Sequence, residues 1–222
     1  AAAAGLRAGD RLYQIGLDST VNMSLDEAVN LLRGREGSLA ELWVERKGWT
    51  RPKRFLIRRA WIKVKSVHSR LLKRRVGIVK IDHFQHTTSD ELNAALKRLR
   101  RKARGRLKGL ILDLRGNPGG LLTQAVQVAD TFITSGPIVT TVGYGDKMRE
   151  PRMATRASTE SSLPIVVLID PSSASASEIV AGALKNHNRA VLIGQKSFGK
   201  GSVQVLYSNK DESALKLTIA QY

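Results

Sequence analysis

The sequence contains no cysteine, few aromatic residues and no long apolar run. The lack of cysteine excludes disulfides, a thiolate nucleophile and a cysteine-ligated zinc site. No apolar run approaches the roughly 20 residues that a membrane-spanning helix needs. The first ten residues also lack the basic leader and apolar stretch of a signal peptide. We therefore expect a cytoplasmic chain, or one whose targeting segment lies outside this sequence.

Acidic residues are scarce relative to basic ones, with 19 Asp and Glu against 37 Lys and Arg, so that the formal net charge is +18. Much of the excess is local, because residues 97–108 and 70–75 are rich in Arg and Lys. No aromatic side chain is interleaved with 97–108, so single-stranded bases would find no stacking platform. We expect no nucleic-acid function. An acidic partner, an anionic membrane surface and simple solubility stay open as reasons for this charge.

Histidines are also few, and two of them raise the question of a metal site. His83 and His86 lie beside Asp82 in DHFQHTT. The segment has the pattern of a strand end running into a loop, and no cluster supplies a third ligand. We therefore predict no metal and no cofactor.

What the sequence does contain begins with a small α/β module in residues 1–60. Ser24 followed by Glu27 forms a capping box, which predicts a helix that ends near Gly34. Two alternating segments, LAELWVERKG and RFLIRRA, predict a strand pair with its turn at Lys47–Gly48.

From residue 76 onward, apolar strands alternate with helical segments, which predicts an α/β layer fold with helices on a sheet. Thr88 and Glu91 form a second capping box at the start of a helix. Residues 135–163 read as a strand followed by a long polar loop that suits the lip of an active site. The last two strands read as a hairpin around 209–211.

The stretch PSSASASEIVAGAL at 171–184 places Ser175 where an apolar strand meets a helix. Unpaired N–H groups at a helix start favour negative charge, which is the arrangement of an oxyanion hole. Ser175 and Glu178 also fit a capping box. This stretch alone therefore favours a helix cap over a nucleophile.

A nucleophilic serine needs a base, and no histidine stands in an obvious position for that role. A lysine serves as a base when burial lowers its pKa, and Lys200 lies between two glycines in QKSFGKGSVQ. The reading of this segment as a phosphate-binding loop fails because a strand follows instead of a helix. A third segment, LDLRGNPGGLL, is a strand-to-helix turn whose adjacent glycines expose N–H groups.

The opening AAAAGLRAGDRLYQIG and the helix SLDEAVNLLRG resemble the second half of a PDZ domain. The three later segments, in this order, resemble the C-terminal processing peptidases, also called tail-specific proteases. The resemblance implies an α/β (α+β) chain with a partial PDZ-like domain at 1–60. A serine peptidase core of crotonase/ClpP-like layers follows at 61–222, and both ends of the protein are expected to be incomplete.

The resemblance also implies site residues. Ser175 matches the nucleophile and Lys200 the general base, and Gln204 matches a glutamine that orients the lysine in some members. The backbone N–H groups of Gly119 and Ala176 match the oxyanion donors. Two details stand apart from these roles. Gly120 is an alternative donor to Gly119, and the aspartate variant of the family is not supported, because Asn186 stands at that position.

The implied function is a serine endopeptidase that recognises protein substrates through apolar C-terminal tails, using a Ser–Lys dyad or a Ser–Lys–Gln triad. The family also implies a periplasmic or otherwise extracytoplasmic location, and it suggests an adaptor or lipoprotein as an additional partner. The alternative from another class is a catalytically idle adaptor that uses its PDZ-like domain to bind protein tails.

Overall fold

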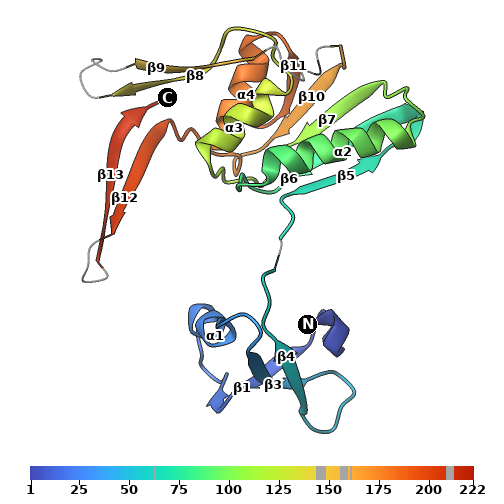
Figure 1. The fold of residues 1–222 in the computed structure, drawn as a ribbon, viewed down its shortest axis with the longest axis vertical. Helices are drawn as coiled ribbons and strands as arrows, with labels where there is room; N and C mark the ends of the chain where they lie inside the picture. The colour runs from blue at the N-terminus through green and yellow to red at the C-terminus, as the bar shows by residue number, and fades with distance from the viewer. Residues whose placement is uncertain (63, 144–148, 156–159, 161, 209–212) are drawn as a thin grey trace. The chain divides into compact units, whose positions relative to one another are not determined.

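A computed structural model describes residues 1–62, 64–143, 149–155, 160, 162–208 and 213–222. The chain divides into two compact units, Ala1–Val64 (unit 1) and Lys65–Tyr222 (unit 2). Figure 1 shows the elements of each unit. Among the described residues, no helix is both long and apolar enough to cross a membrane.

Unit 1 is a four-stranded antiparallel sheet with one helix, and its strand order is β2-β1-β3-β4. The predicted capping box is confirmed, because Glu27 N–H donates to Ser24 Oγ at 3.3 Å and Ser24 N–H donates to Glu27 Oε2 at 2.7 Å. The small core centres on Ile15, Leu42 and Val44. The elements are η1 Ala2–Ala4, β1 Arg11–Ile15, β2 Asp18–Ser19, α1 Leu25–Leu32, β3 Leu39–Glu45 and β4 Lys53–Arg58.

Unit 2 is built on a five-stranded sheet of order β11-β10-β7-β6-β5. Four of its strands are parallel, and β5 runs antiparallel to β6 at one edge. Parallel strands need crossover connections, and helices supply them here, so the predicted α/β alternation is confirmed. The strands are β5 Val67–Leu71, β6 Val76–Ile81, β7 Gly109–Asp113, β10 Ile165–Ile169 and β11 Ala190–Gly194.

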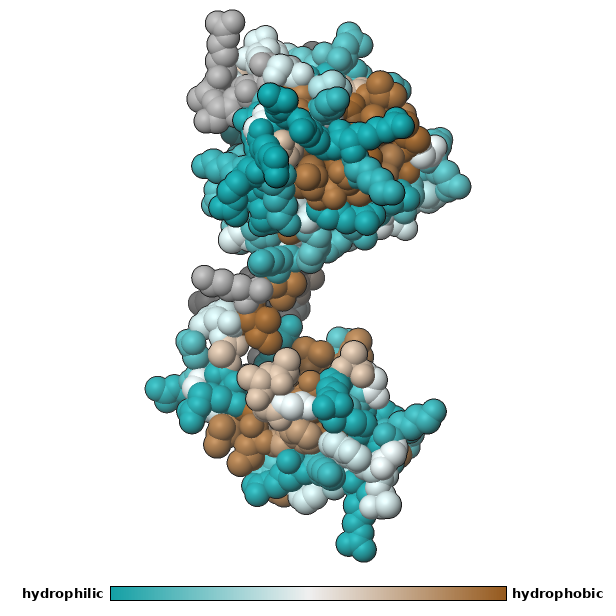
Figure 2. Space-filling view, turned by 90° about the vertical axis from the view of Figure 1, so that its right-hand side faces the viewer, coloured by the Kyte–Doolittle hydropathy of each residue, from teal (hydrophilic) through white to brown (hydrophobic). Residues whose placement is uncertain are grey.

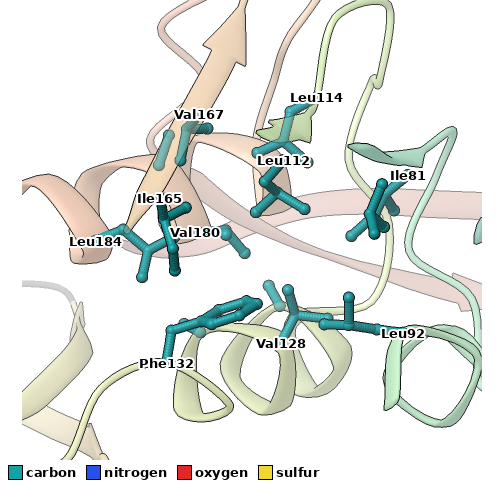
Figure 3. Packing of buried hydrophobic residues seen from close by; sticks show 14 of the residues in the cluster. Ile81, Leu92, Leu112, Leu114, Val128, Phe132, Ile165, Val167, Val180 and Leu184 are labelled. Carbon is teal, nitrogen blue, oxygen red and sulfur yellow. The ribbon is translucent and has the colours of Figure 1, made fainter. Parts of the chain in front are cut away.

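Three helices pack on one face of this sheet: α2 Thr88–Lys102, α3 Leu122–Asp130 and α4 Ala176–Asn186 (Figure 1). Their apolar sides meet alternate strand residues in one core, in which Phe132 and Leu112 are fully buried (Figure 3). The start predicted for α2 is wrong, because Thr88 lies inside the helix. Its Oγ1 accepts a hydrogen bond from the N–H of Gln85 at 2.9 Å and so closes the preceding turn.

A second sheet of unit 2 has the order β12-β13-β8-β9. The prediction of a long polar loop after the strand at 137–143 is wrong in part, because the segment returns as β9 and pairs with β8. The two strands of the predicted hairpin do pair, whereas its turn at 209–211 lies outside the described residues. The strands are β8 Pro137–Gly143, β9 Arg149–Met153, β12 Ser202–Ser208 and β13 Ala214–Gln221.

The direction of the strands gives the five-stranded sheet two unlike edges. Strands β6, β7, β10 and β11 end together, and the turns that follow them form what we call the carboxyl edge. The same strands start together at the amino edge, where the short helix η2 Lys73–Arg75 and the α2–β7 loop lie. Ligands of open α/β sheets bind outside the carboxyl ends of the strands, so the carboxyl edge is where a site is expected.

Candidate active site

Ser175 stands at the carboxyl edge, between the turn after β10 and the first residue of α4. Its backbone angles are φ 54° and ψ −112°, a conformation that residues with a Cβ seldom adopt. The surrounding hydrogen bonds hold it there. Ser175 N–H donates to Glu178 Oε2 at 2.8 Å, and Glu178 N–H donates to the Ser175 carbonyl at 2.8 Å. Such a strained residue at a helix start is typical of a functional position.

The neighbouring serines have a different task. Ser173 is fully buried, and its hydroxyl donates to the Leu114 carbonyl at 2.8 Å. Ser177 is also fully buried, and its hydroxyl donates to the Asn117 carbonyl at 3.0 Å. Both side chains therefore tie the α4 start to the end of β7. Ser175 alone among the three is half-exposed.

The glycine turn after β7 comes directly against Ser175. A Cβ on Gly119, where φ is 107°, would lie 2.9 Å from Ser175 Cβ and 3.1 Å from the Ala176 nitrogen. A Cβ on Gly120 would lie 2.1 Å from the Phe84 carbonyl oxygen. Neither position can hold a larger residue without displacing backbone, so the two glycines permit the close approach of this turn to the nucleophile candidate.

Asn117 fixes this turn in place and is fully buried. Its Nδ2 donates to the Ile81 carbonyl at 2.9 Å, and its Oδ1 accepts the Gly119 N–H at 2.9 Å. Its backbone carbonyl accepts the Ala174 N–H at 3.0 Å. In this conformation the Gly119 N–H is thus engaged, whereas within the described residues no hydrogen bond occupies the N–H of Ala176 or Gly120.

Lys200 lies in the turn before β12 and is half-buried. Ser175 and Lys200 line the same cleft of about 750 Å³, together with residues of β8 and α4. Among the described residues, no hydrogen bond joins Ser175 Oγ to Lys200 Nζ. Gln204 lies on β12, and its Nε2 donates to Thr218 Oγ1 at 3.3 Å. The structure therefore brings Ser175 and Lys200 to one cleft, and it turns Gln204 toward β13.

The carboxylate of Glu178 connects the two halves of this cleft. Besides the Ser175 amide, it accepts hydrogen bonds from Ser197 Oγ at 2.8 Å, Gly199 N–H at 2.6 Å and Lys200 N–H at 2.9 Å. Burial raises the pKa of Glu178, but these donors outweigh it and hold the pKa below the usual 4.5. The ionised carboxylate thus binds the serine turn to the lysine turn.

Sequence reasoning assigned Glu178 only to the start of the helix and gave Asn117 no role. The spacing between Ser175 and Glu178 matches a capping box, and Ser175 N–H donates to the Glu178 carboxylate as that box requires. The other bonds of Glu178 reach a turn about twenty residues further along the chain, which local spacing cannot reveal. The position of Asn117 in the sequence could have indicated its role. A polar residue between a buried strand and a glycine pair must find hydrogen-bond partners.

Two further carboxylates shape the carboxyl edge. The Arg115 guanidinium hydrogen-bonds to Asp113 at 2.8 Å and holds the pKa of that carboxyl below its usual value. Asp170 accepts the Gly116 N–H at 3.0 Å and the Ser172 N–H at 3.0 Å, and these donors lower its pKa in the same way. Both carboxylates are therefore structural clamps on the turns that carry Gly119 and Ser175.

The histidines considered for a metal site have other surroundings. His83 Nε2 lies 3.0 Å from Gln85 Oε1, and His86 borders a shallow polar hollow between α2 and α3. Across the part of the chain that the structure describes, no group of three or more His, Cys, Asp or Glu residues is placed to hold a metal ion.

Comparison with known proteins agrees with this arrangement. A sequence model of peptidase family S41 matches residues 75–222. The chain is 44% identical to a carboxy-terminal-processing protease of Bartonella bacilliformis over 225 residues, covering all of this chain and 51% of the relative. It is 36% identical to the carboxy-terminal processing protease CtpA of Bacillus subtilis, covering 99% of this chain and 46% of the relative.

Among solved structures, the photosystem II D1 C-terminal processing protease aligns with a TM-score of 0.61 and 28% identity. That alignment covers 99% of this chain and 60% of the solved one. The chain thus spans about half the length of the curated relatives it matches. The match over most of unit 2 and the identity to these relatives show that the chain belongs to peptidase family S41.

Proposed function

We propose that this chain carries the catalytic centre of a serine endopeptidase in which Ser175 is the nucleophile and Lys200 the general base. One observation carries the proposal. A single carboxylate, that of Glu178, hydrogen-bonds to the backbone of both residues where they line one cleft. A Ser–Lys pair needs no histidine, so the proposal also accounts for a site that lacks one.

In the proposed reaction, the neutral amine of Lys200 takes the proton of Ser175 Oγ while that oxygen bonds to the substrate carbonyl carbon. The Ala176 N–H at the start of α4 stabilises the resulting oxyanion. A glycine N–H of the 119–120 turn is the second donor. Lys200 then gives its proton to the leaving amine as the C–N bond breaks. Water attacks the acyl-enzyme with Lys200 again as base, which restores both residues.

Gly120 is the better glycine candidate in this conformation, because the Gly119 N–H already donates to Asn117 Oδ1. For Gly119 to donate, that hydrogen bond would have to be exchanged for one to the oxyanion. Gln204 would orient Lys200 only after leaving Thr218, to which it now donates. Gln204 is thus an optional third member of the proposed dyad.

The substrates we propose are protein tails with apolar residues. The cleft beside Ser175 is walled by Ile138, Val139 and Val142 of β8 and by Ile179 of α4, which suits an apolar side chain. Relatives of this chain are named carboxy-terminal processing proteases. Unit 1 has a cleft of about 610 Å³ beside α1, which is our candidate site for holding the tail. The proposed location is extracytoplasmic, where an adaptor or lipoprotein would be the natural additional partner.

The test compares cleavage of an unstructured substrate with an apolar C-terminus by the full-length protein and two variants. Ser175→Ala and Lys200→Met are each expected to lower kcat by at least ~10⁴-fold. Ser172→Ala and Lys196→Met are matched controls, because both residues are exposed and lie close by in the same two turns. Full cleavage by Lys200→Met would exclude Lys200 as the base.

The same experiment separates the alternative of an idle tail-binding adaptor. An adaptor would bind the substrate in all variants and cleave it in none, including the parent protein. Amidation of the substrate's C-terminal carboxylate tests tail recognition by itself. Unchanged kcat/KM after amidation would contradict tail recognition while leaving the dyad intact.

A further inference from the structure

The amino edge of the five-stranded sheet gathers basic side chains from two segments that are distant in sequence. Lys108 N–H donates to the Arg75 carbonyl at 3.0 Å, and Val76 pairs with Gly109, so the β5–β6 turn lies beside the α2–β7 loop. Figure 2 looks toward this end of unit 2, where long hydrophilic side chains lie across and around an apolar area. We call eight residues the basic edge: Lys73, Arg74, Arg75, Arg101, Lys102, Arg104, Arg106 and Lys108.

The charge of the basic edge is not neutralised locally. Residues 70–76 and 97–108 contain no acidic residue. The neighbouring Arg100 pairs with Glu160, but within the described residues none of the eight side chains forms an ion pair. Cations in the last turn of α2 complement the helix dipole, which accounts for Arg101 and Lys102. The other six lie beyond that turn and receive no such explanation.

The backbone conformation of three arginines in the basic edge is independent evidence that they do not stabilise the fold. Arg74 (φ 58°), Arg75 (φ 61°) and Arg104 (φ 52°) adopt left-handed conformations. Each such residue with a Cβ costs roughly 1–2 kcal/mol, and glycine is the usual choice just after a helix, where Arg104 stands. In the described structure none of the three guanidinium groups has a hydrogen bond or ion pair. Strain kept without an internal benefit points to a use outside the molecule.

We propose that the basic edge docks unit 2 onto an anionic phospholipid surface. Two loops of adjacent basic side chains meet the phosphates of a headgroup layer with no need for a shaped pocket. Leu72 and Leu107 lie half-buried in the same loops, and this mixture of basic and apolar side chains suits a membrane interface.

Nucleic acid fits this surface less well. Helix α2 lies along the sheet with Leu92, Leu96 and Leu99 buried, so it cannot enter a groove of a duplex. The one aromatic residue between 66 and 113 is Phe84, which is buried at the carboxyl edge. The segments that form the basic edge therefore offer bases no aromatic stacking platform.

An acidic protein partner is also less favoured. The centres of specific protein interfaces are enriched in aromatic side chains and methionine beside arginine. The exposed large apolar residues of the described chain fall before residue 65 or after residue 152, and none belongs to the basic edge. A headgroup layer needs no such anchor.

The test measures co-sedimentation of the protein with vesicles of phosphatidylcholine, with and without phosphatidylglycerol. Binding is expected only with phosphatidylglycerol and is expected to weaken as salt is added. The triple variant Arg74→Gly, Arg75→Gly, Arg104→Gly removes three charges and should lower the partition coefficient about 100-fold. Because glycine relieves the strained conformations, its unfolding midpoint should equal or exceed that of the parent. The loss of binding is thereby separated from a failure to fold.

A charge-matched control replaces three exposed lysines outside the basic edge, Lys185→Gln, Lys196→Gln and Lys216→Gln. This variant has the same net charge as the triple glycine variant and should bind vesicles nearly as well as the parent. Equal losses in both variants would show that net charge alone drives binding and would overturn the proposal. Tighter binding to duplex DNA than to the vesicles at the same salt would overturn it too.

Discussion

Both edges of the five-stranded sheet contain residues with strained, positive φ angles, but the two edges differ in what holds these residues. At the carboxyl edge, Ser175 is held at φ 54° by bonds to Glu178, and the carboxylates of Asp113 and Asp170 clamp the neighbouring turns. At the amino edge, Arg74 and Arg104 have similar positive φ angles without such clamps. At the carboxyl edge the strained residue is held by a side chain of the protein, whereas at the amino edge the strained arginines direct their side chains outward.

The two edges thus show two ways in which a protein can retain a residue in an unfavourable backbone conformation. A strained residue inside a hydrogen-bonded network is positioned, which catalysis requires. A strained residue whose side chain has no internal partner is only tolerated, which suits a surface that meets a partner of loose geometry. The following variants are ordered from the largest expected effect to the smallest.

Replacing Ser175 separates strain from chemistry. Ser175→Ala removes the hydroxyl and keeps a Cβ in the strained conformation, whereas Ser175→Gly removes both. We expect both variants to lose at least ~10⁴-fold in kcat. Ser175→Gly should be more stable than Ser175→Ala by about 1 kcal/mol in denaturant unfolding. Equal stabilities would show that the positive φ carries no strain.

Glu178→Gln tests whether the carboxyl edge positions its residues through one charge. The amide cannot accept all four donors that the carboxylate holds, so we expect kcat/KM to fall by roughly 100-fold. Glu91 offers a matched control, because its carboxylate also accepts several donors, from Ser66, Val67 and Thr87, at a distance from the cleft. Glu91→Gln should lower stability and leave kcat/KM unchanged. If Glu91→Gln lowered kcat/KM as much as Glu178→Gln, Glu178 would have no specific role in positioning the site.

Gly182 tests the shape of the cleft. It lies within α4 and lines the cleft, and an added Cβ would meet no atom within 4 Å. Glycine in a helix interior lowers stability by about 1 kcal/mol relative to alanine, so packing does not explain its presence. Gly182→Leu should reduce kcat/KM about 10-fold or more for substrates with large apolar side chains. The measurement compares kcat/KM for two peptides that differ only in carrying alanine or leucine at the same position. If the leucine-to-alanine ratio of kcat/KM were the same in Gly182→Leu and the parent, the cleft would not hold the substrate side chain.

Acid should weaken the carboxyl edge and leave the basic edge unchanged. The folded-state pKa of Asp170 lies below its usual 3.8, so its stabilisation is complete above that value and is lost as the pH falls through the folded pKa. The difference in melting temperature between the parent and Asp170→Asn should therefore shrink below pH 3.8. The corresponding difference for Arg104→Gly should stay constant, since arginine does not titrate there. A constant difference for Asp170→Asn would contradict its assigned role.

The sequence predicted the strands and helices of unit 2 well, because buried strands and amphipathic helices leave clear periodicities. Local signals also located Ser175 at a strand–helix junction and Lys200 and residues 119–120 in glycine-containing turns. The roles of these residues came from the family resemblance and stay predictions. The start of α2 was wrong, because Thr88 bonds backward to Gln85 as well as lying near Glu91. Hydrogen bonds between residues distant in sequence could not be predicted. One example is the bond between Glu178 and Gly199, which forms only because β11 and the turn after it fold back over α4.

Asn117 also bears on how the protein ages. Asparagine residues deamidate when the backbone nitrogen of the following residue attacks the side-chain amide, and here that residue is Pro118. Proline has no N–H, so this route to a succinimide is blocked. The buried amide that links the Ile81 carbonyl to the Gly119 N–H is thus chemically durable as well as firmly held. In a protein kept for long periods, spontaneous damage at this turn should be slower than at Asn93 or Asn188, each of which precedes a residue with an N–H.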